Sequence, residues 1–172
     1  MSPGQINFQM PYETSPGPAS VVITTSGSPS PGFSFTVSPS APGVFLSGSH
    51  AIAQNQDGTL NDAGHPIAPA GTLVVYLTGQ GPLDNAVATG AAAPSQPLSR
   101  ATQPYSATIG GQIAPIQFLG LTPGYVGLAQ ANITVPNLSR GDYPLVITVG
   151  GVAGKAADVS VGAPGSGSAA GN

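Results

Sequence analysis

Glycine and proline recur so often along this chain that long helices have no room to form. The 172 residues include 25 Gly and 19 Pro, and both residue types interrupt helices. No stretch of about a dozen residues shows apolar spacing near 3.6 without Gly, Pro or β-branched residues. The apolar residues instead form short β-branched runs between turn residues, which predicts an all-β protein.

Runs with strand character are spread along the whole chain. Phe33–Val37 alternates apolar and polar residues, and Leu73–Leu77 is continuously apolar, as in strands covered on both faces. The other predicted strands are Ile6–Met10, Val21–Ile23, Tyr105–Ile109, Ile113–Leu119, Tyr125–Val135, Tyr143–Val149 and Ala156–Val161. Short strands at about ten-residue spacing, separated by pairs such as Gly110-Gly111 and Gly150-Gly151, predict an immunoglobulin-like β-sandwich.

An internal repeat divides the chain into two unequal parts. The aligned segments are Gln5–Pro11 with Gln130–Pro136, Val22–Thr24 with Val146–Thr148, and Gly27 with Gly151. Each copy ends in one more predicted strand, but only the second follows a long strand-rich segment, Ala41–Leu121. We therefore predict a partial sandwich over residues 2–40, a complete sandwich over 41–161, and a flexible Gly/Ser-rich tail over 162–172.

The partial sandwich is expected to expose unpaired strand edges. Exposed edges recruit strands from other chains, so other protein chains, or other domains of a parent polypeptide, are the expected partners. The predicted strand-pairing residues are Gln5, Ile6, Asn7, Phe8, Gln9 and Met10. Head-to-tail pairing that does not close into a ring would build a filament.

Charge and cysteine content remove several function classes. The net charge is −3, and the only cationic residues are Arg100, Arg140 and Lys155. Three cations make neither a nucleic-acid footprint nor a polybasic membrane patch, and no apolar run approaches the length of about 20 residues that spans a bilayer. Without Cys there are no disulfides and no thiolate metal sites.

The composition is typical of exported bacterial surface proteins. Lys and Glu are scarce, whereas Thr, Ser, Ala, Gly and Asn are abundant. The opening Met1–Gly4 has neither the charged nor the apolar region of a signal peptide. We expect an extracellular or cell-surface location for a mature chain.

Three segments resemble a known family. They are Ser2–Tyr12, Asn55–Asn61 and Gly120–Leu128. In order and in sequence they resemble an uncharacterised bacterial C-terminal domain family, the Solibacter type, found at the ends of large exported proteins. The resemblance covers residues 2–161 and implies a fold similar to the IPT/TIG immunoglobulin-like domains. It brings no established catalytic or ligand residues, and members of the family usually have more sequence before the first of these motifs.

A group of polar residues around Gly58 suggests calcium binding. Its members are Asn55, Asp57, Asn61 and Asp62. An EF-hand loop needs Asp at its first position and Glu at its twelfth, but counting from Gly58 those positions hold Ala53 and Gly64. We expect a hairpin in which Asp57 and Gly58 take the two positive φ values of a type I′ turn.

No other metal, cofactor or catalytic site is predicted. His50 and His65 are the only histidines and are expected to be solvated, since zinc needs three or four ligands. There is no Gly-x-Ser-x-Gly motif, Glu13 is the sole Glu, and Lys155 is expected to be an exposed turn residue. We therefore predict that the protein is not an enzyme.

Aromatic residues suggest one further binding surface. Tyr12, Tyr125 and Tyr143 are candidates for surface contact with polysaccharide. Strand aromatics more often belong to the core, and we expect this of Phe8, Phe33, Phe35 and Phe118. The leading prediction is a non-catalytic structural or adhesive module that assembles by strand complementation. The alternatives are a carbohydrate-binding domain and an accessory domain of a secreted enzyme.

Overall fold

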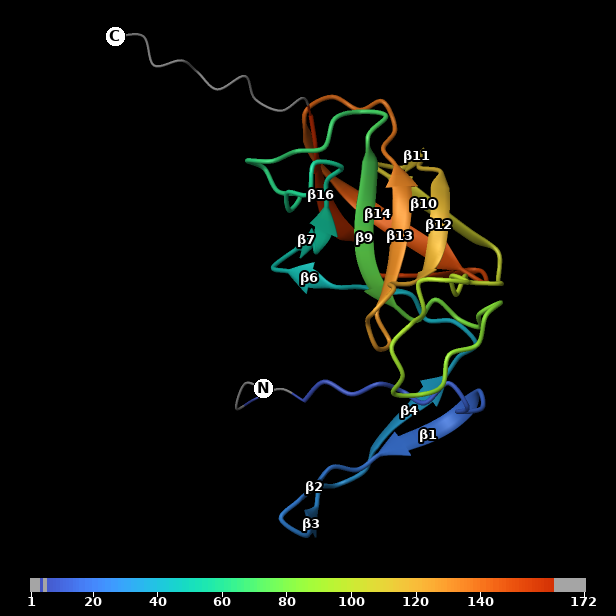
Figure 1. Cartoon of the computed structure of the whole chain (residues 1–172). Helices are drawn as coiled ribbons and strands as arrows, with labels where there is room; N and C mark the ends of the chain where they lie inside the picture. Colours follow the sequence, from blue (N-terminus) through green and yellow to red (C-terminus); the bar gives the residue numbers. More distant parts are fainter. Residues whose placement is uncertain (1–3, 5, 163–172) are drawn as a thin grey trace.

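The computed structural model describes Gly4 and residues 6–162, which form sixteen strands and no helix (Figure 1). This confirms the predicted all-β fold class. Gln5 of the predicted pairing segment and residues 163–172 of the predicted tail lie outside the described residues.

The first of the two large sheets is antiparallel throughout. Its strand order is β12-β13-β9-β5, and β8 also pairs with β9. The bounds are β5 Gly43–Val44, β8 Ala53–Gln54, β9 Thr72–Thr78, β12 Ile116–Leu121 and β13 Ala129–Thr134. The strand predicted over Tyr125–Val135 is shorter than expected, because residues 123–127 turn around Gly124 and Gly127, which both have positive φ.

The second large sheet has the order β11-β10-β14-β16-β7-β6, and β15 also pairs with β14. The bounds are β6 Leu46–Ser47, β7 His50–Ala51, β10 Tyr105–Ile109, β11 Gln112–Ile113, β14 Gly141–Val149, β15 Val152–Ala153 and β16 Ala157–Val161. All of its pairs are antiparallel except β16 with β7. The short strands β5–β8 were not predicted, since two-residue strands leave no alternation to detect.

The core lies between the two large sheets, as in a β-sandwich. Buried residues alternate along the central strands of both sheets, as expected for sheets with one face on a shared core. The fully buried side chains include Leu73, Val75, Leu77, Ile133, Leu145, Ile147, Val149 and Val159. Strands β9 and β14 therefore form the centre of the sandwich, one from each sheet.

The N-terminal part of the chain forms a separate ribbon below the sandwich, at the blue end of the colour scale (Figure 1). Here β1 (Gly17–Val21) pairs with β4 (Phe33–Val37), and β2 (Thr24–Thr25) pairs with β3 (Ser28–Pro29). We call residues 17–37 the N-terminal ribbon. Each of these two sheets has only two strands among the described residues.

The N-terminal ribbon duplicates the last ribbon of the sandwich, residues 141–161, in register. Gly17 pairs with Val37 as Gly141 pairs with Val161, and the same spacing relates every other pair of β1–β4 to β14–β16. The tips also correspond, because Thr24–Pro29 pairs as Thr148–Ala153 does. The repeat seen in the sequence is therefore also a repeat of structure.

The segment before the ribbon is not a strand, so the predicted strand over Ile6–Met10 is wrong. In the second copy the equivalent residues are β13, which lies between β12 and β9. Within the described part of the chain, no strand pairs with residues 6–10. Residues 6–12 instead contact the sandwich, and we call them the strap. The Gly90 amide donates to Gln9 Oε1 at 2.9 Å, and the Tyr12 amide donates to Thr89 Oγ1 at 3.0 Å.

A second attachment joins the ribbon to the sandwich at residues 38–42. The buried Ser40 hydroxyl donates to the Val149 carbonyl at 2.8 Å, and the Ala41 amide donates to the Gly79 carbonyl at 3.0 Å. The ribbon is thus fixed at both of its ends, although in the described residues β1 and β4 themselves pair only with each other.

Candidate functional site

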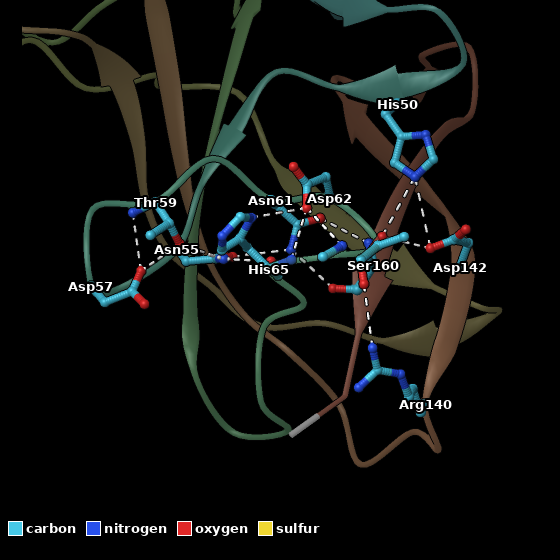
Figure 2. A network of polar contacts seen from close by, with 12 residues as sticks. His50, Asn55, Asp57, Thr59, Asn61, Asp62, His65, Arg140, Asp142 and Ser160 are labelled. Carbon is cyan, nitrogen blue, oxygen red and sulfur yellow. Dashed lines mark hydrogen bonds and ion pairs between the residues drawn. The ribbon is translucent and has the colours of Figure 1, made fainter. Parts of the chain in front are cut away.

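A network of polar contacts surrounds the last strand, β16 (Figure 2). Asn61 lies at its centre and is buried. Its Nδ2 donates to the Ser160 carbonyl at 2.9 Å, and its Oδ1 accepts from the Ser160 amide at 2.8 Å. The side chain of Asn61 therefore pairs with the backbone of β16 as a neighbouring strand would.

Backbone bonds extend this pairing along the whole outer edge of β16. The Asp158 amide donates to the Ser49 carbonyl at 2.9 Å, the Ile67 amide to the Ser160 carbonyl at 3.0 Å, and the Gly162 amide to the Ile67 carbonyl at 2.8 Å. We call these contacts of Ser49, Asn61 and Ile67 with β16 the terminal-strand clamp. The clamp ties the end of the sandwich to residues near its beginning.

Asn55 holds Asn61 in this orientation. Asn55 Oδ1 accepts from Asn61 Nδ2 at 3.0 Å, and Asn55 Nδ2 donates to the His65 carbonyl at 2.7 Å and to Thr59 Oγ1 at 3.1 Å. Both asparagines are buried, and buried amides of this kind are costly unless they are bonded. The motif Asn55–Asn61, which carries part of the family resemblance, thus has a structural role in closing the sandwich.

The turn inside this motif differs from the prediction. A type I′ turn needs two positive φ values, but only Gly58, with φ 87°, has one, and Asp57 does not. The Gly58 amide donates to the Asn55 carbonyl at 2.9 Å, and Asp57 Oδ1 accepts from the amide and hydroxyl of Thr59. Hydrogen bonds from Thr59 lower the pKa of Asp57. The bond from the Thr59 hydroxyl has the largest effect, and the bond from the Thr59 amide comes next.

A second carboxylate closes the following loop. Asp62 Oδ1 accepts from the Gly64 and His65 amides at 2.8 and 2.7 Å and lies 3.1 Å from His65 Nδ1. The hydrogen bond from the His65 amide is the main reason that the pKa of Asp62 is lowered. Because these oxygens already bond to their own loop, they do not converge on a shared point. Among the described residues no group of three His, Cys, Asp or Glu side chains is placed to hold a metal ion.

Ser160, His50 and Asp142 meet on the outer side of β16, an arrangement that invites comparison with a catalytic triad. In a triad the histidine lies between serine and carboxylate and uses a different ring nitrogen for each. Here the Ser160 hydroxyl donates directly to Asp142 Oδ1 at 2.5 Å, and His50 Nε2 is 3.5 Å from Ser160 Oγ and 3.7 Å from that same Asp142 oxygen. Ser160 is also buried, so the geometry matches a structural contact better than an activated nucleophile. His50 is only partly exposed, unlike the solvated loop residue that was predicted, whereas His65 is largely exposed.

An apolar groove of about 390 Å³ lies at one end of the first sheet. It is lined by Phe45, Ile52, Tyr76, Tyr125 and Leu128. Tyr76 points to the outer face of β9, since its neighbours Val75 and Leu77 are buried in the core. Of the predicted surface tyrosines only Tyr125 lines this groove. The sequence did not predict the residues that line the groove with Tyr125. For Tyr76 a signal was present, because alternate residues of the apolar run Leu73–Leu77 must point away from the core.

The other predicted aromatic residues are dispersed. Tyr12 belongs to the strap, and Tyr143 lies on β14 in the other sheet, with its hydroxyl 3.0 Å from Ser139 Oγ. Phe118 is buried as predicted, but Phe8 and Phe33 are 63% and 69% exposed, and Phe35 is only half-buried. The core prediction is wrong for Phe8 and Phe33 because no second sheet among the described residues covers the N-terminal part of the chain. Lys155 is exposed, as expected.

No family model, curated protein or solved structure matches this chain. The resemblance to the Solibacter-type family therefore stays a prediction that depends on its motifs. Within the described residues no helix has the length and hydropathy of a membrane span.

Proposed function

We propose that this chain is a non-catalytic structural module of an exported, cell-surface protein, and that its sandwich carries tension between neighbouring parts of that protein. The observation that supports this most directly is the terminal-strand clamp. Through it, the strand by which the chain leaves the sandwich is bonded along its outer edge to residues 49–67, close to where the chain enters.

The direction of the strands suits this role. β7 and β16 are parallel, and Ile67 forms a second parallel contact with Val161. When the chain is pulled from its two ends, parallel neighbours near those ends slide along each other. Their hydrogen bonds are then loaded together rather than opened one by one, so the pair resists a larger force than an antiparallel hairpin of equal length.

Composition and family resemblance agree with a structural module on the cell surface. The Ser160 hydroxyl bonds to Asp142, and Asp62 bonds to its own loop, so these polar groups are used within the fold. The few charged residues give no strong field to attract a charged ligand. The chain also carries the duplicate ribbon, which is expected if sandwiches of this type follow one another in a longer fibre or stalk.

Single-molecule pulling tests the proposal directly. The chain has no Cys, so Ser38→Cys and a Cys added after Asn172 give two specific attachment points that include the sandwich and leave out the N-terminal ribbon. We expect one unfolding event at a force well above that of thermal fluctuations. Asn61→Ala should lower that force, because it removes the middle of the clamp.

The matched control is Asn137→Ala, which changes an exposed turn residue of the same type. It should leave the unfolding force unchanged. If Asn61→Ala and Asn137→Ala unfold at the same force, the clamp does not bear tension and the proposal fails.

The apolar groove supports a second candidate, binding of a polysaccharide. Tyr76, Tyr125 and Phe45 place three aromatic rings around one hollow, and aromatic rings present large rigid apolar surfaces with a polar edge in the tyrosines. A glycan array probed with the full chain tests this candidate. Binding that Tyr125→Ala abolishes and Tyr105→Ala preserves would support it, since Tyr105 is a partly exposed tyrosine on the other sheet. Silence across the array would remove it.

A further inference from the structure

We infer that the N-terminal ribbon is the closing ribbon of a second sandwich, and that its partner is another polypeptide segment with the strand layout of residues 41–121. This inference rests on the proposed structural function, because it makes the tension-bearing sandwich a repeating unit. The chain itself shows what covers such a ribbon, since residues 141–161 are the same ribbon in its covered state.

The correspondence extends to the turn at the tip of each ribbon. Ser26 and Gly27 have φ values of 50° and 83°, and the equivalent Gly150 and Gly151 have 58° and 81°. Two consecutive positive φ values define the type I′ turn that favours a twisted hairpin. Register and turn geometry are therefore the same in both copies, and the N-terminal ribbon already has the shape of a closing ribbon.

The inward face of the N-terminal ribbon is mostly apolar but incompletely covered. In the second copy the inward residues Leu145, Ile147, Val149, Ala157, Val159 and Val161 are all buried against the opposite sheet. Their counterparts are Val21, Ile23, Thr25, Phe33, Phe35 and Val37. Of these, Ile23, Thr25 and Phe33 are exposed, and the other three are half-buried. The face that the sandwich buries completely in one copy is buried only in part in the other.

Both edges of the N-terminal ribbon are open as well. β14 has β10 along its outer edge, and β16 has β7 and the clamp. Among the described residues β1 and β4 pair only with each other. The partner must therefore supply a strand antiparallel to β1, a strand parallel to β4, and a second sheet for the inward face.

The chemistry of the β4 edge specifies the partner further. Thr36 occupies the position that Ser160 has in the second copy. There, the side chain of Asn61 bonds to both the amide and the carbonyl of Ser160. We therefore expect the partner to carry a loop like Asn55–Asn61, with a buried asparagine that pairs with the backbone of Thr36.

The front half of this same chain does not fit the N-terminal ribbon. Phe33 and Phe35 stand where Ala157 and Val159 are buried in close contact with the core. Replacing a methyl and an isopropyl group by two benzyl groups overpacks a core that is already filled, which is destabilising. Exchange of ribbons between two copies is therefore unfavourable. The partner is a related but different segment, with smaller inward residues opposite Phe33 and Phe35.

A tandem chain tests this inference. Residues 41–129 are placed directly before Gln5. In the natural chain these residues directly precede Gln130, the counterpart of Gln5, so the spacing is the same. Two versions are compared, one with the natural ribbon and one with Phe33→Ala and Phe35→Val, which match the second copy. The measurement is amide hydrogen exchange in β1 and β4, with β14 and β16 of the same molecule as the internal reference.

We expect slow exchange in β1 and β4 of the matched tandem, by at least about 100-fold relative to the natural chain. The tandem with both Phe residues should be protected much less. Within the matched tandem, Val37→Asp should abolish the protection because that side chain points inward. Ser34→Asp should preserve it, because it reproduces Asp158 on the outward face.

Three results would overturn the inference. Fast exchange of β1 and β4 in both tandems would show that the ribbon does not close a sandwich. Equal protection in both tandems would show that the partner need not differ from this chain's own front half. Sedimentation velocity of the natural chain could also reveal a dimer. If Phe33→Ser and Phe35→Ser dissociate that dimer while Ile113→Ser and Leu60→Ser leave it intact, a second copy of the chain covers the face. None of these results affects the pulling experiment, whose attachment points exclude the ribbon.

Discussion

Residues 17–37 and 141–161 have the same strand pairing and the same turn, yet their inward faces differ in burial. Ile147 is 1% exposed, whereas Ile23 at the equivalent position is 44% exposed. Register and turn geometry are decided locally, by the two positive φ values at the tip and by the pairing that follows from them. Burial needs the second sheet, which is distant in sequence.

The comparison also shows which interactions stabilise the fold. A two-stranded ribbon alone is marginal in water, because it buries little apolar surface against the entropy of ordering its backbone. The second ribbon gains a core on one face and a neighbour on each edge. The N-terminal ribbon depends instead on its attachments at the strap and at residues 38–42.

The largest expected difference between the copies is in the response to truncation of an inward residue. Ile147→Ala should lower the free energy of unfolding of the sandwich by about 4 kcal/mol, since it leaves a cavity in a packed core. Ile23→Ala should change it by less than about 0.5 kcal/mol. Urea unfolding followed by circular dichroism measures both. A similar loss in the two variants would mean that the N-terminal ribbon is part of the same cooperative core.

The clamp should give the next largest effect, because only β16 has it. Asn61→Ala leaves the amide of Ser160 and the Oδ1 of Asn55 without their bonding partner, although the Ser160 carbonyl keeps its bond from the Ile67 amide. This should cost roughly 3 kcal/mol. Asn137→Ala, in an exposed turn, should cost less than about 0.5 kcal/mol. Chemical denaturation of the two variants side by side is the measurement, and equal midpoints would contradict a stabilising clamp.

The sequence predicted what depends on local pattern and missed what depends on distant partners. The alternation in Phe33–Val37 predicted β4 with its observed bounds, and the strand predicted over Tyr105–Ile109, before the turn residues Gly110-Gly111, matches β10. The same pattern failed at Ile6–Met10, because that segment lacks the two neighbouring strands that its counterpart β13 has. Asn61 was noticed as an oxygen-bearing residue near a glycine, but its pairing with Ser160 joins residues far apart in sequence, which no local signal reveals.

The turns at the tips of the ribbons should show a smaller and opposite pair of effects. Gly150→Ser places a Cβ where Gln103 Oε1 would be 2.4 Å and Ser40 Oγ 2.9 Å away, at a φ of 58°. We expect a loss of about 1–2 kcal/mol in the free energy of unfolding of the sandwich. In the N-terminal ribbon the exposed Ser26 has a positive φ, which is strained for a residue with a Cβ. Ser26→Gly removes this strain and should slow amide exchange around β2 and β3. Faster exchange in Ser26→Gly would show that the Ser26 side chain stabilises that turn.

Lowering the pH should produce the smallest difference in amide exchange between the sandwich and the N-terminal ribbon. Hydrogen bonds from Thr59 and from the His65 amide lower the pKa values of Asp57 and Asp62 in the folded sandwich. A carboxylate whose pKa is lowered by folding contributes stability above its ordinary pKa, and that contribution is lost as the pH falls through the lowered value. Residues 17–37 contain no Asp or Glu, so the ribbon has no such contribution of its own.

Between pH 6 and about pH 3 we therefore expect amide exchange, corrected for its intrinsic pH dependence, to accelerate around residues 57–65 while the tip of the N-terminal ribbon stays unchanged. Asp62→Asn should flatten the pH response near residues 62–65. An unchanged response in that variant would show that the hydrogen bonds to Asp62 do not link the loop to pH.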